Sequence, residues 1–288
     1  MGIKDNNISL KQDDLSLSIP IEDVLAIILD DKETTITQKF ITKCSEQNII
    51  LLFTDEKHLP STAIIPFGNY SKPLLRLRDQ INQSDSFKKK IWRKIIKSKI
   101  INQSDVLFLC NKDGSFLKKI SDNVKIGDKT NLEAYAASEY FKVLFGEDFN
   151  RNIDCQENFF LNYSYAIVRG VVARNLMAYG FNCSLGIKHH NQYNAFNLAD
   201  DFIEPFRPLI DLFIIKNINK LKNLDISEVK KELLNILNMQ ILWNQEKHRI
   251  TTAIERVIIS YIKSIESQDI NNLVLPNIME LSLHKYEK

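Results

Sequence analysis

The chain has 288 residues, 44% of them hydrophobic, which is enough to bury one large core or two modest ones. No apolar run approaches the roughly 20 residues that span a bilayer, and residues 1–10 lack the apolar core of a signal peptide. The four cysteines are far apart in the sequence and form no CxxC pair, which argues against a zinc site or a disulfide framework. We therefore expect a cytoplasmic globular protein.

The net charge of +2 hides an uneven distribution along the chain. Residues 1–71 carry six Lys against eleven Asp or Glu, a charge of −5, whereas residues 72–101 carry ten Lys or Arg against two acids, a charge of +8. Residues 102–288 then account for the remaining −1. A basic segment that follows an acidic one indicates a polyanionic partner.

The first seventy residues have the pattern of a β-rich domain. Alternating or short apolar runs predict strands, and one helix is predicted between them, within residues 34–48. The predicted strands lie near residues 8–10, 15–19, 24–29, 49–53 and 61–67. The pattern changes between Gly68 and Pro73, and no further strand is expected until the end of the chain. We predict an α+β protein with a small β-rich domain, residues 1–71, and a larger all-α domain, residues 72–288.

The segment 86–101, SFKKKIWRKIIKSKII, predicts a helix with an apolar stripe and a separate basic face. Further helices are predicted at 130–145, 157–179, 194–222, 226–238 and 250–267. A charged face over a core stripe is often only solvated surface. Here the excess of positive charge favours contacts to the DNA phosphate backbone, which supply affinity but no sequence information. We call this set the basic face: Lys90, Arg93, Lys94 and Lys97.

Acidic residues and a histidine pair are close together in LGIKHHNQYNAFNLADDFIEP (185–205). On a helix, Asp200 and Asp201 lie four and three residues before Glu204, so these like charges need a Lys, an Arg or a metal ion between them. Pro205 disfavours the α conformation at Glu204, so we expect a kink there. The alternative is a polar turn followed by an ordinary helix. Upstream, Glu133 is explained equally well as a first-turn residue stabilised by the helix dipole.

Four segments taken together resemble a known family. TNLEAYAASEYF, LNYSYAIVRGVVARNLMAYG, LGIKHHNQYNAFNLADD and EPFRPLID are similar to the successive motifs of the CRISPR-associated spacer integrases, the "Cas one" family. The similarity is strongest to the versions that accompany single-protein effector systems. It extends over roughly the whole chain, but its specific motifs lie within residues 127–211.

The resemblance implies a set of site residues. Glu133, His189 and Glu204 match the metal-binding triad of the family, with His189 chosen over His190 by motif spacing. Asp201 matches a further acidic position, either as a fourth ligand or as a support for the ligands. Two oxygen donors and one imidazole suit Mg²⁺ or Mn²⁺. Positions around the active site of the family are matched by Asn162, Tyr165 and Arg169.

The resemblance also implies a reaction and an assembly. The 3′-OH of a short double-stranded DNA would attack the CRISPR repeat by transesterification, so that a new spacer is inserted, and water as nucleophile would give endonuclease activity. Family members form homodimers through the β-rich domain. Two such dimers flank a dimer of a small partner, "Cas two", in a heterohexamer.

Two other functions remain open from the residues alone. One is a stand-alone metal-dependent DNA repair nuclease, which would cut DNA but would not join ends to a repeat. The other is a non-catalytic DNA-binding scaffold, in which the acids only cap helices and EDTA would change nothing.

Overall fold

A computed structural model describes the whole chain except residues 13–14, 25, 48, 57–59, 65–71 and 285–288. The described N-terminal residues form two small sheets. Strands β1 (Gly2–Lys4), β2 (Asn7–Gln12) and β3 (Leu15–Pro20) make an antiparallel sheet. In the second sheet β4 (Ala26–Leu29) runs parallel to β5 (Ile50–Thr54), which pairs antiparallel with β6 (Pro60–Ile64).

Helix α1 (Gln38–Glu46) makes the connection that the parallel pair β4 and β5 requires. Its N-terminus is capped by Thr37, whose hydroxyl accepts a hydrogen bond from the Phe40 backbone N–H at 3.2 Å. Phe40 is fully buried, and it packs with Ile8, Ile21, Ile49 and other apolar residues in a cluster of its own. The N-terminal elements therefore have a separate small core.

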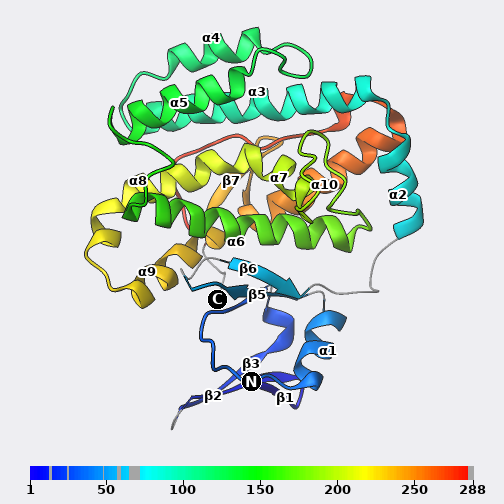
Figure 1. Ribbon diagram of the computed structural model, residues 1–288, viewed down its shortest axis with the longest axis vertical. Coiled ribbons are helices and arrows are strands. Elements are labelled where there is room, and N and C mark those ends of the chain that lie inside the picture. The colour runs from blue at the N-terminus through cyan, green and yellow to red at the C-terminus, as the bar shows by residue number, and fades with distance from the viewer. Residues whose placement is uncertain (13–14, 25, 48, 57–59, 65–71, 285–288) are drawn as a thin grey trace.

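The helices lie in layers above the second sheet (Figure 1). Helix α6 (Gln156–Ala178) packs on β5, and at Gly170 of α6 a Cβ would lie 3.1 Å from a methyl carbon of Leu52. The helical part is built from α2 (Pro73–Asn82), α3 (Asp85–Leu109), α4 (Ser115–Asn123), α5 (Leu132–Phe145), α6 (Gln156–Ala178), α7 (Asn197–Ile203), α8 (Arg207–Lys222), α9 (Ile226–Leu233) and α10 (Ile250–Ser267).

Helix α3 is a long helix that contacts several other elements of the helical part. Ser84 caps its N-terminus by accepting from the Phe87 N–H at 3.2 Å. From there α3 packs against α4, α5 and α8, and against the turn that joins α7 to α8. Its apolar stripe, predicted from Phe87, Ile91 and Ile95, is buried in the main core. The prediction of a helix at 86–101 is confirmed, and the helix continues two turns further.

The α+β prediction is confirmed, with a small β-rich part followed by a larger helical part. The proposed boundary at 71 stays a prediction, because residues 65–71 lie outside the described part. The expectation of no further strand was wrong, because β7 (Gln240–Trp243) and β8 (Glu246–Arg249) form a hairpin within the helical part. Its two-residue turn, Asn244–Gln245, has positive φ at both positions without a glycine, so the usual sequence signal is missing.

The predicted helix 194–222 is divided in two. Helix α7 ends at Ile203, a 3-10 turn occupies Glu204–Phe206, and α8 begins at Arg207. The break falls where Pro205 predicted it. The conformation expected at Glu204 was wrong, since this residue keeps right-handed helical angles (φ −52°, ψ −44°). The chain tightens into a 3-10 turn there without leaving the helical region.

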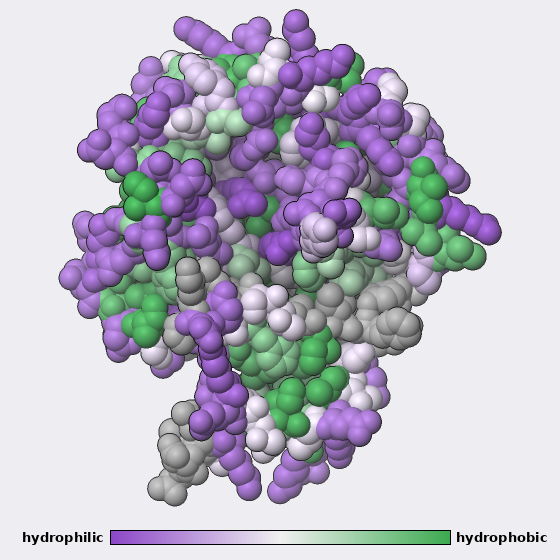
Figure 2. Space-filling view, in the orientation of Figure 1, coloured by the Kyte–Doolittle hydropathy of each residue, from purple (hydrophilic) through white to green (hydrophobic). Residues whose placement is uncertain are grey.

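The two parts of the molecule differ at the surface. Figure 2 shows mostly hydrophilic atoms over the helices and an apolar area over the N-terminal strands. On β3, the side chains of Leu17 and Ile19 are 57% and 37% exposed. None of the described helices is both long and apolar enough to cross a membrane.

Candidate metal and nucleic-acid site

The loop that carries His189 is tied to helix α7 by one carboxylate. Asp201 is fully buried and accepts backbone N–H bonds from Ile187, Lys188 and His189 at 2.5, 3.1 and 3.2 Å. Gly186 allows this close approach, because a Cβ there would lie 2.2 Å from the carbonyl oxygen of His189. The sequence LGIKHH thus folds around the Asp201 side chain.

Asp201 also orients the His189 ring. The Nδ1 atom lies 2.8 Å from Asp201 Oδ1, so in the neutral ring with its proton on Nδ1 the Nε2 atom can act as a ligand. The hydrogen bond to Asp201 is the main cause that raises the pKa of His189 above its ordinary value. The edge of the ring meets the Trp92 ring of α3, with ring centres 5.9 Å apart.

Glu133 and Glu204 meet at a single cation, and we call them the carboxylate pair. Lys99 Nζ lies 2.5 Å from Glu133 Oε1 and 2.5 Å from Glu204 Oε2, so these two oxygens are no more than twice that distance apart. Glu204 Oε1 accepts from Arg207 Nε at 2.9 Å. Burial alone would raise the pKa of Glu204, but Arg207 and Lys99 together lower it to about 2.

Local structure places each member of the carboxylate pair. Glu133 lies in the first turn of α5, where Asp128 accepts the backbone N–H of Leu132 and of Glu133 at 3.0 Å each. Glu204 lies in the 3-10 turn, which Asn102 of α3 holds by donating to the Pro205 carbonyl oxygen at 2.8 Å. Helix α3 therefore holds the turn that carries Glu204 through Asn102, and it contacts both Glu133 and Glu204 through Lys99.

The donor chemistry fits a hard divalent ion. The set offers two carboxylates and one imidazole. Glu204 Oε2 is buried, and among the described residues its close polar contact is the ion pair with Lys99 Nζ at 2.5 Å. Such an acceptor is suited to a cation. Within the described ranges, however, no three His, Cys, Asp or Glu side chains are grouped closely enough to hold a metal ion.

Each acidic side chain within residues 200–204 has its own partner, which offsets its negative charge. Asp200 pairs with Arg169 of α6, whose Nε lies 2.6 Å from Asp200 Oδ1, and Asp201 is held by backbone N–H groups. The repulsion expected among Asp200, Asp201 and Glu204 is therefore relieved by a different donor at each position. Arg169 also lies over the Phe196 ring, 4.8 Å from its centre.

The other two sequence-predicted residues on α6, Asn162 and Tyr165, each contact an arginine. Arg207 lies over the Tyr165 ring at 4.5 Å, and the Tyr165 hydroxyl donates to the buried carboxylate of Asp211. Asn162 accepts from Arg151 at 2.7 Å. Tyr165 thus supports Arg207, which in turn contacts Glu204. Asn162 is further from the carboxylate pair in this chain of contacts.

Three of the four cations of the basic face are engaged within the protein. Arg93 donates to the Val124 carbonyl oxygen at 2.8 Å, Lys94 donates to the Ile270 carbonyl oxygen at 2.9 Å, and Lys97 Nζ lies 3.7 Å from Asp122. Burial lowers the pKa of Lys94. Lys90 is exposed. The prediction that this face binds DNA stays a prediction, with Lys90 as its most accessible member.

A second group of cations lies beside the site. A cavity of about 280 Å³ adjoins the His189 loop, and we call it the basic pocket. It is lined by Asp85, Lys88, Lys89, Trp92, Gly127, Ile187, Lys188 and His190. Because Trp92 contacts both this pocket and His189, the pocket lies next to the candidate ligand His189.

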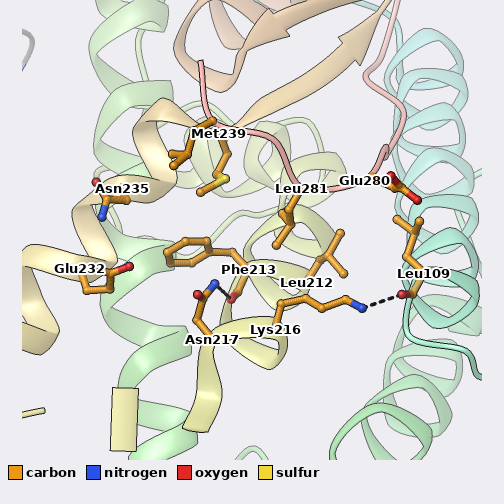
Figure 3. A pocket seen from close by; sticks show the side chains of 11 residues that line it. Leu109, Leu212, Phe213, Lys216, Asn217, Glu232, Asn235, Met239, Glu280 and Leu281 are labelled. Atoms are coloured by element: carbon orange, nitrogen blue, oxygen red, sulfur yellow. Dashed lines mark hydrogen bonds between the residues drawn. The ribbon is translucent and has the colours of Figure 1, made fainter. Parts of the chain in front are cut away.

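A larger cavity, about 470 Å³, lies elsewhere (Figure 3). It is bounded by α8, by Glu232 and Asn235, and by Glu280 and Leu281 near the C-terminus. None of the candidate site residues lines it.

Sequence reasoning missed Lys99 and Arg207. Lys99 continues the four-residue spacing of Ile91 and Ile95, so a lysine at a core position was the available signal. It was counted only as part of the basic excess. Arg207 lies three residues after Glu204, a spacing at which helical side chains pair.

Comparisons with known proteins agree with the fold and the motifs. The model of the family described as CRISPR associated protein Cas1 matches residues 1–240. A CRISPR-associated endonuclease Cas1 of Neisseria meningitidis serogroup C (strain 8013) is 35% identical over 291 residues, covering 100% of this chain and 96% of that protein.

Solved structures share the fold at low sequence identity. A casposase bound to integration product superposes with a TM-score of 0.76 at 18% identity, covering 93% of this chain and 88% of that chain. A chain of a Cas6-RT-Cas1–Cas2 complex gives a TM-score of 0.74 at 19% identity, covering 96% of this chain and 35% of that chain. The family match and the curated relative together show that this chain belongs to the Cas1 family of CRISPR-associated proteins.

Proposed function

We propose that this protein is a metal-dependent DNA integrase and endonuclease of CRISPR adaptation, which inserts new spacer DNA into the array by 3′-OH transesterification. One observation carries the proposal: Glu133 of α5 and Glu204 of the 3-10 turn before α8 converge on a single cation position in the helical part. Family membership supports it, as do a relative named an endonuclease and a structural neighbour bound to an integration product.

The proposed cofactor is Mg²⁺ or Mn²⁺, held by Glu133, His189 and Glu204. Bound there, the ion would supply charge stabilisation at the phosphodiester under attack and orient the attacking hydroxyl. Asp201 supports His189 and is not a ligand in this proposal, because the backbone N–H bonds of the loop and the His189 ring already use its oxygens.

The remaining residues position the acids and the DNA. Arg207, supported by the Tyr165 ring, keeps Glu204 ionised and in place. Because the basic pocket adjoins the His189 loop, we propose that its lysines, Lys88, Lys89 and Lys188, bind phosphates beside the reacting bond. The basic face would extend this DNA contact along α3, mainly through Lys90, which directly follows Lys89 of the basic pocket.

The proposed assembly is a homodimer formed through the β-rich part, joined to Cas2 in a heterohexamer. The exposed apolar side chains of Leu17 and Ile19 on β3 support a protein contact there. The Cas2 partner is supported by the neighbour in a Cas6-RT-Cas1–Cas2 complex. We further propose a cytoplasmic setting, in keeping with four cysteines that are all unpaired.

The test is an integration assay with Cas2, a prespacer duplex with free 3′-OH ends and a plasmid that carries the repeat. Glu133→Gln, Glu204→Gln and His189→Ala should each abolish Mn²⁺-dependent joining and cutting while circular dichroism stays unchanged. The matched control is Glu139→Gln, also on α5, which removes only a partly exposed pair with Lys142.

Each alternative function has its own outcome in this assay. Cutting without joining would identify a stand-alone repair nuclease, and DNA binding without any metal-dependent chemistry would identify a scaffold. Joining at the wild-type rate by any of the three variants would remove that residue from the site.

A further inference from the structure

Lys99 is a buried cation on the side of α3 that otherwise packs apolar residues into the hydrophobic core. Only 6% of the residue is exposed, and it lies one turn beyond the fully buried Ile95 on α3. A charge at such depth is costly unless it is paired. Its partners are Glu133 and Glu204, the two residues proposed above to hold a divalent ion.

The ammonium and the proposed ion need the same oxygens. Lys99 Nζ lies 2.5 Å from one oxygen of each acid, whereas Mg²⁺ binds carboxylate oxygens at about 2.0–2.1 Å. A divalent ion bound to either oxygen would therefore lie no more than about 4.6 Å from Nζ. Two cations this close in a poorly solvated site repel strongly.

We infer that Lys99 competes with the divalent ion for the carboxylate pair, and that the displaced ammonium binds a phosphate oxygen of the DNA. The inference rests on the proposed function and concerns its regulation. Lys99 then keeps the two acids together when no ion holds them, and it makes the site accept an ion most readily when DNA is present.

The surroundings of Lys99 point to DNA as the second partner. Arg207 also contacts Glu204, and its charge repels Lys99. A displaced ammonium must find another anion, because leaving it buried and unpaired is costly. The phosphates of the substrate would bring that anion into the site. Binding of metal and binding of DNA are then coupled, and each tightens the other by the same factor.

The test measures metal affinity, not catalysis. Free Mn²⁺ is followed by electron paramagnetic resonance while the full-length protein is titrated, with and without a short duplex that is checked to be uncut afterwards. The variant is Lys99→Met, which keeps the length of the side chain and removes its charge. The matched control is Lys118→Met on α4, an exposed lysine near Asp105 of α3 that belongs to neither proposed DNA-binding group.

We expect Lys99→Met to lower the Kd for Mn²⁺ without DNA by about tenfold, because a unit charge at the ion position is removed. Lys118→Met should leave the Kd unchanged. Added DNA should tighten Mn²⁺ binding to the wild type clearly more than to Lys99→Met. If Lys99→Met binds Mn²⁺ no more tightly than the wild type, or shows the same gain from DNA, the inference is overturned while the metal site stands.

Glu133→Gln and Glu204→Gln separate this result from failure of the proposed function. If neither variant weakens Mn²⁺ binding, the metal site itself is wrong, and the inference is lost with it. Should Lys99→Met fail to fold, a crystal structure of the wild type with Mn²⁺ decides. We expect Nζ to have left at least one carboxylate, and an ion bound to both acids with both Lys99 contacts kept would refute the competition.

Discussion

Replacing Asp201 by Asn tests whether this residue builds the site or binds the metal. The two oxygens of its carboxylate accept three backbone N–H bonds from the His189 loop and contact the His189 ring. Asparagine keeps one acceptor oxygen and turns the other into an NH₂ donor. That donor would face N–H groups in a site from which water is excluded, since Asp201 is 0% exposed.

The expected loss of stability follows from these bonds. A hydrogen bond to a charged group contributes about 1.5–3 kcal/mol, and a buried donor left without a partner costs a further ~1–3 kcal/mol. Because one oxygen still accepts, we expect the free energy of unfolding to fall by about 3 kcal/mol. Asp200→Asn is the matched control, and its partly exposed pair with Arg169 should be worth only about 1 kcal/mol.

The assay is urea denaturation in EDTA, at pH 6 and at pH 8. The Asp201 bond raises the pKa of His189 above 6.5, so this stabilisation is complete below about pH 6.5 and is lost as pH rises through the raised pKa. Asp201→Asn should therefore cost more at pH 6 than at pH 8. A loss no greater than that of Asp200→Asn would refute the structural role. In the integration assay, activity as low as that of Glu204→Gln would indicate a direct ligand.

Four further predictions concern the histidine pair, the two groups of cations and a buried acid. His190→Ala should impair joining less than His189→Ala in the integration assay, and the reverse order would shift the proposed ligand by one residue. Gln at all three lysines of the basic pocket should flatten the slope of log affinity against log salt by about 2–3 on duplex DNA. Gln at all four cations of the basic face should flatten it by about 1, the contribution of Lys90, because the other three are already engaged within the protein; no change would show that this face is only solvated. Burial raises the pKa of Asp211 to about 6, so this group lowers stability as pH rises from about 4 through 6. Asp211→Asn should therefore be more stable relative to wild type at pH 7 than at pH 4.5 in urea denaturation, and an equal difference at both pH values would contradict this.

Periodicity alone predicted most of the elements. Spacing of apolar residues is a local property, and it located α3, α5, α6 and α10, as well as strands β2 to β6. The short helices α2 and α4 and the hairpin β7–β8 were missed. The hairpin lacks a glycine turn, and it is held by backbone bonds to the C-terminal segment, such as that between Leu242 and Asn277. Because these bonded residues are far apart in the sequence, no local pattern of residues can reveal their pairing.

The residue types of the candidate site and their order along the chain are visible in the sequence. Glu133, His189 and Glu204 were predicted because the short motifs around them resemble those of a known family. What each side chain contacts depends on the tertiary structure. Lys99 lies 34 residues before Glu133 and about a hundred before Glu204, yet one ammonium meets both carboxylates. Asp201 supports the loop because its oxygens accept hydrogen bonds from the backbone N–H groups of residues 187–189. Such pairings depend on how helices pack, since burial makes an unpaired charge costly and folding selects the partner that is within reach.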